Sequence, residues 1–118
     1  MEQPERLTTL CRWFVTAARQ HLLAMEDMDE VAAGNETARL MRIYRAFRQE
    51  GSMGQEALLG LVDHGEPAVA GMAAVFSLRY APERCKVVLL AISRQEGLLA
   101  MRAEVALERW EKGEWDLD

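Results

Sequence analysis

The chain has 118 residues, half of them apolar, which suffices for one domain with a buried core and leaves no room for a second domain. Its formal net charge is −5 and its pI is about 5.1, which argues against general nucleic-acid binding, because that requires a basic surface. No segment approaches the roughly 20 apolar residues of a membrane helix, and the chain opens without the basic and apolar stretches of a signal peptide. We therefore expect a cytoplasmic protein that contacts neither membrane nor nucleic acid.

The first half of the chain is predicted to form two helices joined by an acidic connection. Apolar residues recur at spacings of three and four over residues 5–25, which marks one face of a helix. The connection at residues 26–30 is rich in Asp and Glu, and Asp29 or Asn35 is the candidate N-cap of the next helix. That helix continues to about Glu50, and the glycine-containing residues 51–54 predict a break after it.

Four shorter helices are predicted to follow, at residues 55–62, 67–78, 83–92 and 98–110. Pro67 suits the first position of a helix, where its missing N–H costs nothing. The helix that it opens is apolar almost all round and is expected to be central and buried. Gly113 is the candidate stop of the last helix, so residues 1–113 form the single domain and residues 114–118 a tail.

The apolar stripes of the last two helices predict which of their faces are buried. The fifth helix is expected to bury Val87, Val88, Leu90 and Ala91. The last helix is expected to bury Leu98, Met101, Val105 and Trp110. In the first helix, Trp13 is expected to lie in the core or half-buried beside it.

Six amphipathic helices with short connections predict an all-α fold with antiparallel neighbours. Residues 58–69, with the sequence LLGLVDHGEPAV, resemble the core of a HEAT-type repeat. In that pattern a Leu-rich helix ends at an Asp, here Asp63, and a Pro, here Pro67, opens the next helix. The resemblance implies a HEAT-like α–α superhelix, a right-handed solenoid of about six short helices in antiparallel pairs.

Most of the chain is similar to the bacterial domain of unknown function 2019 family over residues 35–113. The landmarks are Asn35, Tyr44, Gly51, residues 58–69, Ala73-Ala74, Pro82 and the closing pattern Ala103-Glu104-x-x-Leu107-x-x-Trp110-x-x-Gly113. This resemblance implies a short helical solenoid and no established chemistry. Some small helical proteins of this kind look like immunity proteins, which neutralise toxins that competing bacteria secrete.

No arrangement of residues predicts catalysis, a metal site or a cofactor. Cys11 and Cys85 lie far apart, outside any CxxC or Cys/His ligand spacing, and are expected to be reduced, buried thiols. His64 stands beside Asp63 in a turn, where a solvated or capping role explains it better than catalysis, because no nucleophile motif is present. His21 lies near the end of the first helix, where a cation is favourable.

Acidic residues form the candidate binding site. Asp27, Asp29 and Glu30 lie in the connection, with Asp63 and Glu66 in the turn before the proline. We expect this surface to meet the basic active site of a toxin, such as a nuclease, by charge complementarity. A solvated connection between two helices is the alternative interpretation. Trp115 is either an exposed interface anchor or packs against the core.

These features favour a non-catalytic protein-binding module, and specifically an immunity protein that binds and neutralises a bacterial toxin. An adaptor or scaffold protein is one alternative. A small helical ligand-binding protein or enzyme, with a pocket between its helices, is the other. The protein is expected to be a monomer or a homodimer.

Overall fold

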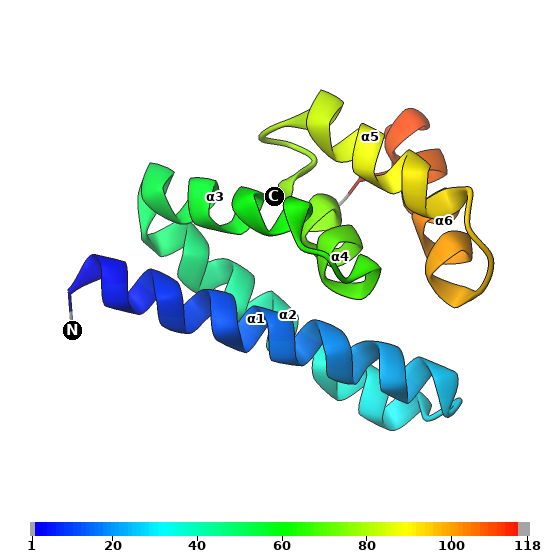
Figure 1. Cartoon of the computed structure of the whole chain (residues 1–118), viewed down its shortest axis with the longest axis horizontal. Helices are drawn as coiled ribbons and strands as arrows, with labels where there is room; N and C mark the ends of the chain where they lie inside the picture. The colour runs from blue at the N-terminus through cyan, green and yellow to red at the C-terminus, as the bar shows by residue number, and fades with distance from the viewer. Residues whose placement is uncertain (1, 116–118) are drawn as a thin grey trace.

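Six α-helices and one turn of 3₁₀-helix occupy residues 2–115, the part of the chain that the computed structural model describes (Figure 1). The helices are α1 (Gln3–Glu26), α2 (Glu30–Gln49), α3 (Gly51–Gly60), α4 (Pro67–Ser77), α5 (Pro82–Ser93) and α6 (Leu98–Glu111), with η1 (Leu61–Asp63) directly after α3. No strand occurs within these residues, so the all-α prediction is confirmed. The right-handed solenoid stays a prediction.

The two longest helices, α1 and α2, form a hairpin along one side of the molecule (Figure 1). Asp29 is the N-cap of α2, because its side chain accepts a hydrogen bond from the Ala32 N–H at 3.0 Å. This contact decides between the two candidate caps, and Asn35 lies inside the helix. The hairpin turn is therefore as short as the acidic connection predicts.

The break predicted at residues 51–54 is wrong, because α3 begins at Gly51, directly after α2. Gly51 has a φ of 71°, a left-handed conformation that ends α2 without an intervening loop. Gly54 is buried in the first turn of α3, where a Cβ atom would lie 1.9 Å from the Phe47 carbonyl oxygen. The two glycines thus permit a sharp bend between two closely packed helices.

Helix α4 lies at the centre of the fold, as its all-round apolar sequence predicts. Pro67 occupies its first turn. Seven of its residues are buried, namely Ala68, Val69, Ala70, Ala73, Ala74, Phe76 and Ser77. Phe14 of α1 makes edge-to-face contacts with Phe47 of α2 and Phe76 of α4, at centroid distances of 6.3 and 6.0 Å. These rings join three helices into the main core.

Helix α6 buries a different face from the predicted one. Its buried side chains are small, namely Ala100, Ala103 and Ala106. The side chains predicted to be buried are 40%, 62% and 53% exposed, namely Leu98, Met101 and Val105. Periodicity identifies apolar stripes on a helix, but it does not tell which stripe a neighbouring helix covers.

Two further burial predictions are wrong for the same reason. In α5, Val87 and Leu90 are 68% and 44% exposed. The buried residues of that helix are Cys85, Leu89 and Ile92. In α1, Trp13 is 57% exposed.

Gly113 ends α6, as predicted. Its φ of 72° is left-handed, its N–H donates to the Trp110 carbonyl at 3.1 Å, and the Glu114 N–H donates to the Arg109 carbonyl at 2.9 Å. Trp115 follows half-buried, with its ring edge-to-face on Trp110 at 5.9 Å between centroids. Residues 116–118 of the predicted tail lie outside the described residues.

Candidate functional site

An open apolar cleft lies between the tip of the α1–α2 hairpin and the helices α4 and α6, which Figure 1 places opposite that tip. Its volume is about 810 Å³, within the range of roughly 300–1,000 Å³ that is usual for ligand sites. Five of the seven methionines of the chain line it, namely Met25, Met28, Met41, Met72 and Met101. The cleft is therefore rich in methionine as well as apolar.

The α6 wall presents large apolar side chains to the cleft and small ones to the core. Leu98, Met101 and Val105 line the cleft, whereas the alanines of α6 are buried. A helix that completes a core has the opposite distribution, because burying a large apolar side chain stabilises by roughly 1.5–3 kcal/mol. Helix α6 thus has an apolar face that no other element within residues 2–115 covers.

Met28 forms part of the opposite wall, at the tip of the hairpin. Its N–H donates to the Met25 carbonyl at 3.0 Å and the Asp29 N–H donates to the Ala24 carbonyl at 2.9 Å, so Met28 occupies the left-handed position of a Schellman turn. It has a φ of 57° and its side chain is 87% exposed. Glycine suits this position better, because a left-handed L-residue costs roughly 1–2 kcal/mol. The strain and the exposed thioether at the cleft make Met28 a candidate for function.

His21 of α1 also lines the cleft and is only 4% exposed. Burial lowers the pKa of its imidazole below the ordinary value of 6.5, and the positive charge of Arg102 lowers that pKa further. The ring is therefore neutral at pH 7, with one donor and one acceptor nitrogen. The expectation that His21 acts as a cation at a helix end is accordingly wrong.

The two walls of the cleft carry opposite charges. Asp29 and Glu30 line it from the start of α2, and Arg102 and Arg109 line it from α6. Within residues 2–115 no ion pair joins these walls. The cleft is consequently an apolar surface between an acidic and a basic edge.

The first group of predicted site residues belongs to this cleft. Asp29, Glu30 and Trp115 line it. Asp27 is exposed beside them, at the C-cap of α1. Trp115 contacts Trp110 and packs half-buried against the core, and its role as an interface anchor stays a prediction.

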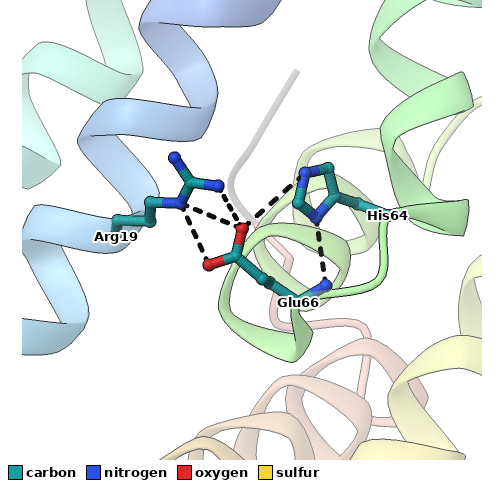
Figure 2. Close-up of polar contacts among 3 residues, drawn as sticks. All are labelled: Arg19, His64 and Glu66. Atoms are coloured by element: carbon teal, nitrogen blue, oxygen red, sulfur yellow. Dashed lines mark hydrogen bonds and ion pairs between the residues drawn. The ribbon is translucent and has the colours of Figure 1, made fainter.

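The second group is neutralised within the chain, because Asp63 and Glu66 each pair with an arginine of another helix. Arg19 of α1 donates from Nε to both carboxylate oxygens of Glu66, at 3.0 and 2.9 Å, and Nη2 also donates (Figure 2). These hydrogen bonds hold the pKa of Glu66 below its usual value. Nδ1 of His64 accepts a hydrogen bond from the Glu66 N–H at 3.0 Å (Figure 2). Arg84 of α5 donates to Asp63 at 2.5 Å, so the turn is tied to α1 and α5.

Neither a metal cluster nor an activated thiol is found in residues 2–115. No three His, Cys, Asp or Glu side chains there are grouped so that they could hold a metal ion. Burial raises the pKa of Cys85 to about 11 and also raises the pKa of the half-buried Cys11, so both thiols are protonated at pH 7. None of the described helices is long and apolar enough to cross a membrane.

The methionine cluster is the part of the site that sequence reasoning missed. Its members come from α1, the hairpin turn, α2, α4 and α6, so no helical spacing connects them. The only signal in the sequence is the number of methionines, which core filling also explains.

Comparison with known proteins found no family model, no curated protein and no solved structure that matches the chain.

Proposed function

We propose that this protein is a non-catalytic binding module that docks an amphipathic helix of a partner protein in the methionine-lined cleft. The observation that carries the proposal is the open apolar cleft of about 810 Å³, with uncovered large side chains on α6. Helix-in-groove recognition takes the apolar face of a helix into such a groove, with anchors at spacings of three, four and seven residues.

The exposure of the walls favours a helix over a small molecule. A small-molecule site encloses roughly 70–90% of its ligand. Met28, Met101 and Val105 are 87%, 62% and 53% exposed, so the cleft is open along one side. A helix is about 10–12 Å wide with its side chains and contacts both walls of an open groove at once.

The methionines support the same proposal. An unbranched, polarizable side chain adapts its shape to an incoming surface, and methionine is frequent on protein surfaces that bind helical partners. Met28 and Met101 stand on opposite walls, one on the hairpin tip and one on α6. A bound helix would remove both from water, which supplies the driving force for association.

Toxin neutralisation is a narrower form of this proposal, favoured by the acidic hairpin tip. Asp27, Asp29 and Glu30 are exposed, and no ion pair holds them within residues 2–115. A basic partner would be steered to this tip and then anchored by the cleft. Charge reversal at Asp27 and Glu30 should weaken such a complex at low salt. Unchanged affinity would refute the proposal that the protein inhibits a toxin, but it would leave the proposal of a helix-binding module standing. Asp29 is left intact in this test because it caps α2.

The test of the cleft compares two valine substitutions on neighbouring helices. Val105→Asp places a charge in the cleft, and Val87→Asp places the same charge on an exposed face of α5 outside it. Each tagged variant and the unaltered protein would capture partners from an extract of the source cells, with mass spectrometry of stoichiometric species. We expect one partner to be retained by Val87→Asp and reduced about tenfold or more by Val105→Asp. Equal capture by both variants would refute the cleft as the docking site.

A further inference from the structure

We propose that His21 and Arg102 form a carboxylate-binding pair in the cleft, which receives an Asp or Glu side chain of the docked helix. This inference rests on the proposed function and specifies the chemistry of the partner. It assigns a binding role to two polar side chains that lie among apolar ones.

His21 has a largely buried side chain that borders the cleft. It is 4% exposed, yet it lines the cleft from α1. No hydrogen bond joins its ring to another residue within the described range 2–115. Its ring nitrogens are not among the sealed, unpaired polar atoms, so they face the open cleft and a ligand that enters it can reach them.

Arg102 supplies the positive charge. It lines the cleft from α6, as His21 does from α1, and its charge adds to the effect of burial in lowering the pKa of the His21 imidazole. No carboxylate of residues 2–115 forms an ion pair with it, in contrast to Arg19 and Arg84, which are paired with Glu66 and Asp63. Arg102 is exposed at the edge of the cleft, and a guanidinium can bind a carboxylate through two parallel hydrogen bonds.

The two groups complement the two oxygens of one carboxylate. The guanidinium donates to one oxygen, and the N–H of the neutral imidazole donates to the other. The negative charge then favours protonation of the imidazole, so its pKa should rise when the ligand binds. The other charged groups that line the cleft are Asp29 and Glu30 on the opposite wall and Arg109 on α6.

The spacing of the arginines predicts the pattern on the partner. Arg102 and Arg109 are seven residues apart, which places them on one side of α6 about 10 Å apart along its axis. A helix that lies along α6 would present acidic residues at i and i+7 beside its apolar stripe. Its other flank would face Asp29 and Glu30 and should be basic.

The experiment uses two 18-residue amphipathic peptides with a leucine stripe and a lysine flank. The first peptide carries Glu at positions i and i+7 on the flank opposite the lysines. The second peptide is identical except that Gln replaces both Glu residues. Affinity would be measured by calorimetry with the full chain, and the two histidine rings would be followed by NMR. His21→Gln and Arg102→Gln are the variants, and Arg94→Gln on the exposed end of α5 is the matched control.

We expect the Glu peptide to bind about tenfold tighter than the Gln peptide, and Arg102→Gln but not Arg94→Gln to abolish the difference. The pKa of His21 should rise only with the Glu peptide. If both peptides bind equally well and the pKa of His21 does not change, the proposed carboxylate-binding pair is refuted. The proposal that the cleft binds a helix would still stand. Binding of neither peptide would overturn the helix groove itself. If octanoate binds in a way that depends on Arg102 and neither peptide binds, the ligand of the cleft is a small amphiphile and not a partner helix.

Discussion

Side-chain size and burial are related in opposite ways in the α4 core and in α6. Around α4 the largest side chains are inside, and Phe14 and Phe47 are 0% and 1% exposed. In α6 the alanines are inside, while Met101 and Val105 are 62% and 53% exposed. Both regions belong to one chain, so poor packing in general does not explain the difference. Under the proposed function, a bound helix would give α6 the cover that α4 already has.

The largest expected effect tests whether the two regions differ in stability. Phe14→Ala should lower the free energy of unfolding by about 3–5 kcal/mol, because it leaves a cavity in the core. Val105→Ala should change it by less than about 0.5 kcal/mol, because its side chain is half-exposed. Urea denaturation of both variants measures the contrast. A large loss of stability in Val105→Ala would show that α6 is covered within the chain.

A smaller effect of opposite sign is expected at the hairpin tip. Met28→Gly should raise the free energy of unfolding by about 1 kcal/mol, because glycine tolerates the left-handed backbone at this position. Met53→Gly, in the first turn of α3, should instead lower it by up to about 1 kcal/mol, because glycine loses more backbone entropy on folding than other residues. Met28→Gly should also weaken partner binding. A stabilised protein with unchanged partner affinity would remove Met28 from the site.

The smallest effect is a two-step dependence of stability on pH. Burial, with the charge of Arg102, lowers the folded pKa of His21, so unfolding takes up a proton and stability should fall once the pH drops below about 6.5. The pKa values of Glu50 and Glu66 are lowered by hydrogen bonds from Arg6 and Arg19. Their contribution is present above about pH 4.5 and is lost as the pH falls through their folded pKa values.

Denaturation midpoints at pH 7.5, 5.5, 4.5 and about 3 would resolve the two steps. His21→Gln should flatten the upper step and keep the lower one, whereas Glu66→Gln should reduce the lower one. An unchanged upper step in His21→Gln would show that this ring is not held neutral by the cleft.

The two acidic turns teach a related lesson about charge. In sequence they are equivalent clusters of carboxylates, and both were expected to contact a partner. In the folded chain Glu66 is held by Arg19, which is 47 residues away, whereas Asp27 and Glu30 remain exposed. An acidic cluster therefore indicates an interaction surface only once its internal partners are known.

Local chemistry determined most of the secondary structure. The Asp29 cap, Pro67 in the first turn of α4 and the left-handed Gly113 each act within a few residues of the chain, so their roles can be read from the sequence. The all-apolar composition of α4 likewise predicted its central position, because no face of that helix suits water.

Tertiary structure alone decided which surfaces remained uncovered. The sequence shows two apolar stripes on α6, and only the packing of its alanines selected the stripe of Leu98, Met101 and Val105 for the cleft. The five methionines converge from separate elements, and His21 and Arg102, which are 81 positions apart in the sequence, line the same cleft. Such contacts depend on how whole helices are placed, which no spacing within a single helix encodes.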